Sequence, residues 1–424
     1  MAGKKGQTPA HVTKKQFLHP GIEFPFIQIL EGIDDPRKPS VFFRYSLTSI
    51  LFMTAVAMMC GATDWPKVVI MSQGMAEWLA QYVDMTSGVP CERTFKDLFN
   101  IIQPETMEQA LREISSQIRD KLPQETINFD GQTERGTADK HHQIGGLHFV
   151  HAWSCENAIC LGQLKVEDKS NEITAVPKLM ESLDLKGAII TTDALNTQKA
   201  TAQKAVESGA DYILPVKGNH PTLLEEVISA FKRLEEEEAR ARRLWERSVA
   251  KAKENRDEDR VKDLLLKGVP PSGASHWKEE TEKAHGRIET RSCIAMRAKE
   301  LPSKDEWEGL TTIARIDRER IEGEKVERSQ TYYITSLEPQ SEVIGRAARQ
   351  HWGVEGLHWR LDVTFKQDQS RYRNRVGARN LAVVRKLVLN ALLKEKSLKG
   401  GIATKQCAAA CNPTYRIKVI KNLF

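Results

Sequence analysis

The hydrophobic pattern of the chain changes its period near residue 126. Between residues 23 and 120 apolar residues recur at helical spacing, which predicts an all-α domain. Its most apolar run, Ser46–Ala62, predicts a buried core helix, because the run is too short to span a membrane and contains several hydroxyl side chains. After residue 126, apolar and polar residues alternate in short runs typical of β-strands. A helical domain is therefore followed by an α/β domain.

The α/β part has a recognisable order of elements. The predicted strands are Thr126–Asp130, Gly146–Ser154, Ala158–Glu167, Lys186–Asp193 and Asp211–Val216, and the predicted helices between them are Asn171–Leu183 and Thr197–Gly209. Three consecutive strands at the start exclude the strict alternation of a dinucleotide-binding fold. The order β-β-β-α-β-α-β is that of a ribonuclease-H-like core, expected over residues 121–220 and completed by helices at 341–396.

Three further segments surround this core. Residues 221–340 predict an insertion subdomain, with a long charged helix followed by strands near 287–298, 310–316 and 331–337. Residues 1–22 are basic and poor in apolar side chains, which predicts a disordered tail. Residues 397–424 are expected to form a basic C-terminal tail.

Charge and cysteine content narrow the class of protein. The net charge is only +6, but residues 366–424 contain fourteen lysines and arginines against two acids. Such a concentration indicates either a polyanionic partner such as nucleic acid or a solvated surface. Seven scattered cysteines without a C-x-x-C pair give no support to a zinc ribbon or a redox motif, and they suit a reducing cytoplasm. No secretory signal is visible at the basic N-terminus, so a cytoplasmic location is expected.

Two aspartates mark the candidate site. Asp130 and Asp193 each close a predicted strand, and strand ends are where open α/β sheets place their ligand chemistry. Two neighbouring carboxylates repel each other, and a bound cation or a proton relieves the repulsion. Either residue alone could instead cap a helix or begin a turn. The pair together favours a metal site.

Six motifs carry a family resemblance. They are Phe129-Asp130-Gly131-Gln132-Thr133, Lys169-Ser170-Asn171-Glu172-Ile173, Thr192-Asp193-Ala194, Pro215-Val216-Lys217-Gly218-Asn219, Ala284-His285-Gly286-Arg287 and His351-Trp352-Gly353-Val354-Glu355. Together they resemble the insertion-sequence DDE transposases, in the branch that includes the H-repeat-associated proteins. The resemblance extends from about Phe24 to Lys394.

This resemblance implies a site and a reaction. Asp130, Asp193 and Glu355 would be the catalytic triad and the ligands of Mg²⁺ or Mn²⁺, with Glu355 on a helix packed against the sheet. Two such ions about 3.5–4 Å apart assist phosphoryl transfer, and hard cations prefer oxygen ligands. The partners would be double-stranded DNA, as element terminal repeats and as target, bound by a homodimer or higher oligomer near the nucleoid. The helical N-terminal domain would bind the terminal repeats.

Basic residues near these motifs are candidate DNA contacts. Lys217 follows the fifth strand, Arg287 follows a His-Gly turn, and Arg371, Arg373 and Arg375 lie beyond the glutamate helix. The alternative for each is an ordinary exposed side chain in a turn or loop. His141, His142, His148 and His151 are interpreted as turn and strand residues, because hard-metal phosphoryl chemistry does not require imidazole.

Three other interpretations stay open. Glu355-x-x-His358 with Glu282-x-x-His285 could form a di-iron carboxylate motif, although that needs a helical bundle. A nuclease of the same fold would cut DNA without joining it to a target. A non-catalytic DNA-binding protein derived from a transposase would bind DNA in a salt-dependent way without cutting it.

Overall fold

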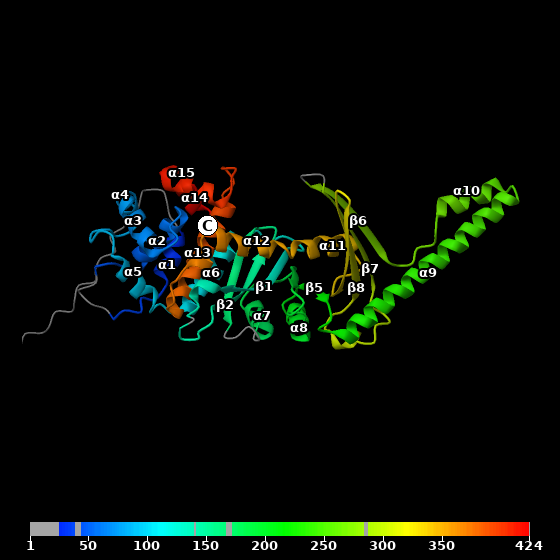
Figure 1. The fold of residues 1–424 in the computed structure, drawn as a ribbon, viewed down its shortest axis with the longest axis horizontal. Coiled ribbons are helices and arrows are strands. Elements are labelled where there is room, and N and C mark those ends of the chain that lie inside the picture. The colour runs from blue at the N-terminus through cyan, green and yellow to red at the C-terminus, as the bar shows by residue number, and fades with distance from the viewer. Residues whose placement is uncertain (1–24, 39–43, 140, 167–171, 284–286, 424) are drawn as a thin grey trace, which may run out of the picture. The chain divides into compact units, whose positions relative to one another are not determined.

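The computed structural model describes residues 25–38, 44–139, 141–166, 172–283 and 287–423. The chain divides into two compact units, Met1–Ala110 with Asn374–Phe424, and Leu111–Arg373. The predicted disordered tail, residues 1–22, lies outside the described residues, as do parts of two family motifs, residues 169–171 and 284–286. Figure 1 shows the course of the chain.

The first unit is all-helical. Its helices are α1 (Pro25–Glu31), α2 (Leu47–Met59), α3 (Trp65–Gly74), α4 (Ala76–Leu79), α5 (Glu92–Phe99), the start of α6 (Pro104–Ile118), α13 (Arg375–Lys394), α14 (Ile402–Cys411) and α15 (Pro413–Lys421). Helix α2 is buried over nearly its whole length, which confirms that its apolar run is a core helix. Within the described ranges, no helix combines the length and apolar composition that crossing a membrane requires.

The segment predicted as a basic C-terminal tail, residues 397–424, is mostly helical. Residues 402–421 form α14 and α15, and two of their basic side chains, Lys405 and Arg416, are buried. The Lys405 ammonium donates to the main-chain carbonyls of Leu392, at 2.8 Å, and Glu395. A basic composition is therefore compatible with a packed helical pair here, because carbonyl groups at the end of α13 accept hydrogen bonds from the buried ammonium group.

The second unit is built on one sheet of nine strands. They are β1 (Thr126–Glu134), β2 (Leu147–Ser154), β3 (Ile159–Val166), β4 (Ile189–Thr192), β5 (Asp211–Val216), β6 (Ser275–Lys283), β7 (Arg287–Arg297), β8 (Thr312–Glu322) and β9 (Lys325–Thr335). Their order across the sheet is β3-β2-β1-β4-β5-β9-β8-β7-β6. Strands β1, β4 and β5 are parallel, whereas all other neighbours are antiparallel. The predicted element order through β5 is confirmed, and the fold is mixed α/β.

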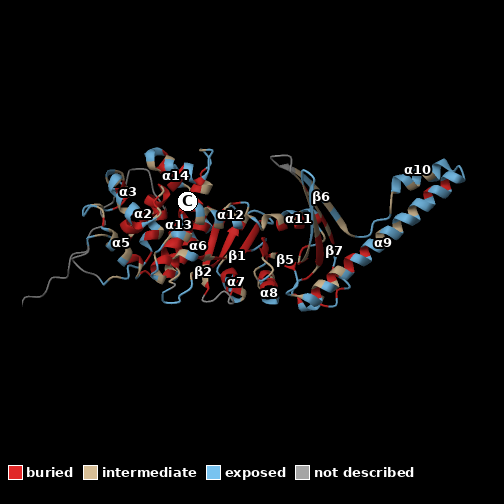
Figure 2. Ribbon diagram, viewed as in Figure 1, coloured by how far each residue is buried: buried red, intermediate tan, exposed pale blue. Residues whose placement is uncertain are grey.

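Each face of this sheet has its own apolar core. Ile190 belongs to a cluster with residues of α7 (Glu172–Glu181), α8 (Lys199–Glu207) and α9 (Pro221–Glu254). Its neighbour Ile189 belongs to a second cluster, which includes Ile344 of α11 (Ser341–Gln350). Successive side chains of a strand point to opposite faces, so this alternation assigns every residue of β4 to a face. Figure 2 shows buried residues in the central strands and in α7 and α8.

The insertion over residues 221–340 adds strands to the core sheet, and part of it extends away from the sheet. Strand β9 pairs with β5, so β6–β9 continue the sheet of the core. Helix α9 packs on the sheet by its N-terminal half, through Leu223, Val227 and Phe231. Its other half extends away from the sheet together with α10 (Glu258–Lys267), as seen in Figure 1. The predicted single helical stretch over 221–265 is therefore two helices that fold back on each other.

Two strand predictions need correction. Strand β1 does not end at Asp130 but continues to Glu134, because its second half pairs with β2 from Asp130 opposite His151 to Glu134 opposite Leu147. Strand β6 was not predicted. Its sequence is almost entirely polar, so it lacks the apolar alternation that identifies a half-buried strand.

Candidate active site

Asp130 of β1 and Asp193, the residue directly after β4, occupy corresponding positions on adjacent parallel strands. Phe129 of β1 is in register with Thr192 of β4, and each aspartate is the next residue along its strand direction. Neighbouring strands are about 4.8 Å apart. Asp130 has the same side-chain parity as Asn128, and Asp193 has that of Thr191, so both carboxylates lie on the face covered by α11. The two aspartates, which are far apart in the sequence, therefore meet on one face of the sheet.

Glu355 faces the same space as the aspartates. It lies in the first turn of α12 (Gly353–Trp359), which follows α11 after a short break. Asp130, Asp193 and Glu355 all line one cavity of about 500 Å³. Glu355 is exposed, whereas the two aspartates are partly buried. The cavity thus has two carboxylates at its floor and a third at its rim.

Hydrogen bonds from β1 fix the start of the glutamate helix. The side-chain amide of Asn128 donates to the main-chain carbonyls of Gln350 and His351, at 2.8 and 3.1 Å. The hydroxyl of Thr126 donates to the side-chain oxygen of Gln350 at 2.6 Å. Asn128 and Thr126 are buried, so these bonds are shielded from water. They fix the turn that precedes Glu355 against the strand that carries Asp130.

The Asp130 carboxyl has a strongly shifted pKa. Burial, together with the negative charges of Asp193, Glu172 and Glu355, raises its pKa from 3.8 to about 7, although the Gly131 amide donates to it at 2.9 Å and opposes the rise. Without a cation, the neutral form of this group is therefore well populated near neutral pH. A positive charge between the carboxylates would reverse this shift.

The donor atoms suit a hard divalent cation, although no complete cluster is formed in advance. Asp130, Asp193 and Glu355 supply carboxylate oxygens, and Mg²⁺ takes one or two carboxylates together with water and substrate oxygens. Among the described residues, no group of three His, Cys, Asp or Glu side chains stands close enough together to hold a metal ion. Asp130 and Asp193 would hold the cation, and Glu355 would have to approach from the rim.

Two family models match most of the chain. The model of the "Transposase DDE domain" matches residues 120–391, and that of the "DDE_Tnp_1-associated" region matches residues 27–114. The first match alone covers more than half of the chain. This chain belongs to the DDE transposase family.

Its relatives share nearly the whole length. "Putative transposase YncI" of Escherichia coli O157:H7 is 32% identical over 405 residues, which are 93% of each chain. "H repeat-associated putative transposase YhhI" of Escherichia coli K12 is 30% identical over 384 residues, 89% of this chain and 93% of that protein. The resemblance to this branch of the DDE transposases is thereby confirmed.

The transposase also has a buried acid beside the site that sequence reasoning did not single out. Glu172, at the start of α7, bonds to His148 of β2 and accepts a hydrogen bond from the Asn196 amide at 3.3 Å. The same Asn196 amide, together with the Asn196 main-chain N–H, donates to Asp193 at 2.9 Å. Glu172 belongs to one of the family motifs, but no local sequence pattern indicates that its side chain is buried beside Asp130.

Gly131 is required by this arrangement. A Cβ atom on residue 131 would lie 2.6 Å from the Oε1 atom of Glu172 and 2.7 Å from its Cδ atom. Real Cβ atoms do not approach other heavy atoms so closely. The glycine after Asp130 therefore leaves room for the Glu172 carboxylate.

The predicted basic residues lie in different places. Lys217 lines the cavity of the three acids and is exposed. Arg371 and Arg373 line another cavity of the same unit, together with Arg135 and His141. Arg375 starts α13 in the helical unit. Arg287 starts β7, but its side chain lies outside the described part of the chain.

The histidines occupy turns and strands, as predicted, yet two imidazoles approach the site. His358 of α12 lies 3.7 Å from the Asp130 carboxylate through its Nδ1 atom, and its Nε2 atom lies 3.3 Å from Nδ1 of His151. The di-iron alternative needs His285, which lies outside the described residues. Glu355 and His358 project from a seven-residue helix beside a sheet, and such a site requires a helical bundle.

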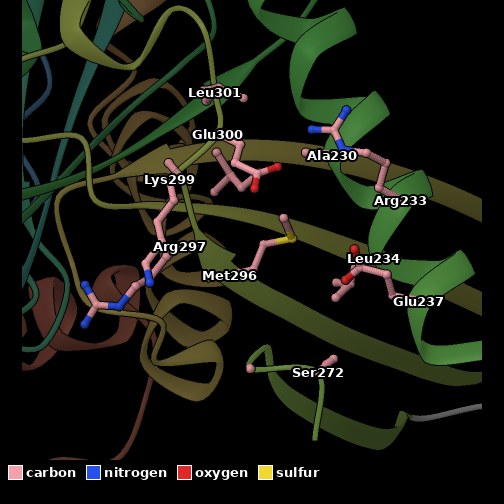
Figure 3. Close-up of a pocket in the computed structure, with 13 residues that line it drawn as sticks. Ala230, Arg233, Leu234, Glu237, Ser272, Met296, Arg297, Lys299, Glu300 and Leu301 are labelled. Carbon is pink, nitrogen blue, oxygen red and sulfur yellow. The ribbon is translucent and has the colours of Figure 1, made fainter. Parts of the chain in front are cut away.

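A second cavity of the α/β unit is separate from the acids. It has a volume of about 270 Å³ and lies between α9 and the chain around the end of β7. Figure 3 shows Arg233 and Glu237 of α9 on one side and Met296, Arg297 and Lys299 on the other. Asp130, Asp193 and Glu355 are not among the residues that line it.

Proposed function

We propose that this DDE transposase cleaves DNA at the ends of an insertion sequence and joins the freed 3′-hydroxyl groups to target DNA. The observation that carries the proposal is the convergence of Asp130, Asp193 and Glu355 on one cavity. The order β3-β2-β1-β4-β5 supports a ribonuclease-H-like core around them. Family membership supports the reaction class.

The three acids would have different roles in binding the cations, according to their positions in the cavity. Asp130 and Asp193 would hold divalent cations, Mg²⁺ or Mn²⁺, at the cavity floor, and Glu355 would complete the ligand set from the rim. When bound, the cations activate an attacking oxygen and neutralise the leaving oxygen. Asn196 orients Asp193 through two hydrogen bonds, and Asn128 fixes the turn before Glu355. The protein's own part is thus to position three oxygen donors around one phosphate.

Basic side chains would bind the DNA backbone. Lys217 lines the cavity of the acids and would contact a phosphate near the cleaved bond. Further proposed contacts are Arg371, Arg373, Arg375 at the start of α13 and Arg287 at the start of β7. The helical unit would bind the terminal repeats, and two ends would be joined by a homodimer or a higher oligomer on DNA.

A cleavage assay tests this function. The full-length protein is incubated with Mg²⁺ and a DNA fragment carrying the sequences that flank its gene, and nicked and joined products are separated. Asp193→Ala is expected to lose at least ~100-fold in cleavage rate, because even the partners of metal ligands contribute 10–100-fold. Asp259→Ala, an exposed aspartate in the first turn of α10, is the matched control and is expected to cleave at the wild-type rate.

Each alternative gives a different result in the same assay. Equal cleavage by Asp193→Ala and wild type would reject the proposal. Nicked DNA that is never joined would indicate a nuclease, and salt-dependent binding without metal-dependent cleavage would indicate a DNA-binding protein.

A further inference from the structure

The cavity of the three acids reaches far across the insertion strands. Its floor is formed by alternate residues of β5, β9 and β8, and it reaches Arg318 of β8 and Arg291 of β7. These side chains share one face of the sheet, because Arg291 has the parity of Cys293, which belongs to the core beneath α11. Strand β8 is the third strand from β4, so Arg318 lies about 14 Å across the sheet from the strand of Asp193.

Arg291 and Arg318 stand directly opposite each other on β7 and β8. Like charges in directly opposite positions destabilise a sheet. The two guanidinium groups share a single buried carboxylate, that of Glu289, which pairs with Arg291 and lies 3.3 Å from Arg318. A second acid, Glu279, stands opposite Arg291 on β6, but it pairs with Arg349 at 2.6 Å. Three arginines therefore share two carboxylates here. The single negative charge of Glu289 can balance only one of the two guanidinium charges of Arg291 and Arg318.

Both guanidinium groups also have unused donors. The Nη1 atom of Arg291 and the Nε atom of Arg318 are buried, and neither has a hydrogen-bond partner among the described residues. A buried donor without an acceptor is costly. Burial lowers the pKa of Arg291, and the charges of Arg349 and Arg318 lower it further against the opposing effects of Glu289 and Glu279. All of these features would be relieved by an anion with several acceptor oxygens.

We propose that Arg291 and Arg318 bind backbone phosphates of the DNA strand that enters this cavity, at the end of the cavity away from the acids. The guanidinium fork matches phosphate oxygens in a bidentate way, so each arginine can satisfy its donors on a phosphate. This inference rests on the proposed function and adds a second part to the same site. A purely structural role in neutralising Glu289 needs only one of the two arginines.

The salt dependence of DNA binding tests the pair. The full-length protein and a short duplex of arbitrary sequence are titrated in EDTA, so that binding is measured without cleavage, over a series of salt concentrations. Each lost phosphate contact reduces the slope of log K against log salt by about 0.9. Arg318→Gln is expected to reduce it by about 0.9, and Arg291→Gln with Arg318→Gln by about 1.8.

A matched control lies on the neighbouring strand. Arg328 of β9 is 76% exposed, and it is paired with Glu319 across the opposite face of the sheet. Arg328→Gln removes the same charge and is expected to leave the slope unchanged. Arg318→Gln keeps the ion pair of Arg291 with Glu289, so this single variant gives an answer even if the double variant does not fold.

The possible outcomes separate the two proposals. If wild type binds the duplex and the arginine variants keep its slope, the phosphate role of the pair is wrong and the proposed function stands. If Arg328→Gln loses as much slope as Arg318→Gln, the effect belongs to general surface charge and the pair is again rejected. If wild type does not bind DNA at low salt, the proposed function itself fails.

Discussion

The hydroxyl of Thr191 donates a hydrogen bond to the side-chain oxygen of Asn128 over 2.6 Å. Asn128 lies two residues before Asp130, and Thr191 lies two residues before Asp193, so each is on the same strand face as its aspartate. The Asn128 amide bonds in turn to the carbonyls of Gln350 and His351, just before the helix of Glu355. One buried asparagine thus connects the three segments that carry the acids.

Replacement of this asparagine is expected to damage both stability and cleavage. Asn128→Leu keeps a similar volume but removes the amide that donates to the carbonyls of Gln350 and His351 and the oxygen that accepts from Thr191. The remaining neighbours are weaker or longer: Cys155 Sγ lies 3.3 Å from the Gln350 carbonyl, and His351 Nδ1 lies 3.1 Å from the Thr191 hydroxyl. An unsatisfied buried group costs about 1–3 kcal/mol, so the free energy of unfolding is expected to fall by at least that amount. Cleavage is expected to fall more than 10-fold, a factor that a loss of about 1.4 kcal/mol of transition-state stabilisation produces.

Denaturant unfolding and single-turnover cleavage measure these effects. Asn255→Leu, at an exposed position after α9, is the control for the substitution itself. DNA affinity should be unchanged in Asn128→Leu, because the residue is buried beneath the site. A variant as active as wild type would show that Asn128 does not position the glutamate helix.

Stability without divalent cations is expected to depend on pH through Asp130. Burial and the nearby carboxylates raise its pKa from 3.8 to about 7, so the folded protein binds this proton more tightly than the unfolded chain. The resulting stabilisation is complete below about pH 4 and is lost as the pH rises to about 7, by up to about 1.4 kcal/mol per pH unit. Asp130→Asn, which is neutral throughout, should lack this contribution.

Unfolding in EDTA across this pH range gives the measurement. Wild type should lose stability relative to Asp130→Asn as the pH rises. Addition of Mg²⁺ at neutral pH should then raise the melting temperature of wild type more than that of the variant, since a cation bound to the folded state stabilises it. If the free energy of unfolding depends on pH in the same way for both proteins, and Mg²⁺ raises both melting temperatures equally, the environment assigned to Asp130 is wrong.

Gly131 is expected to tolerate no side chain. Gly131→Ala would place a Cβ atom 2.6 Å from a carboxylate oxygen of Glu172, which His148 and Asn196 hold in place. Overpacking of this kind costs about 1–3 kcal/mol. Gly145→Ala is the matched control, because nothing lies within 4 Å of a Cβ atom there. Thermal unfolding should separate the two variants, and equal melting temperatures would mean that Glu172 can move aside.

The sequence alone determined the order of elements through β5 and the family, and it predicted the residues of the site. Alternating apolar residues identified β1 to β5 with their two intervening helices, and the motifs identified the family. Asp130, Asp193 and Glu355 were selected by those motifs, and the structure brings all three to one cavity. These features are local, because the spacing of apolar side chains and the residues of each motif lie within short stretches of the chain.

Tertiary structure decided which distant segments meet. The pairing of β9 with β5, the burial of Glu172 beside Asp130 and the opposition of Arg291 to Arg318 all join residues far apart in the sequence. The polar strand β6 gave no apolar signal, because its main-chain groups are paired with β7 rather than buried by its own apolar side chains. Hydrogen-bond partners across a sheet are chosen by the whole packed chain, so no local pattern specifies them.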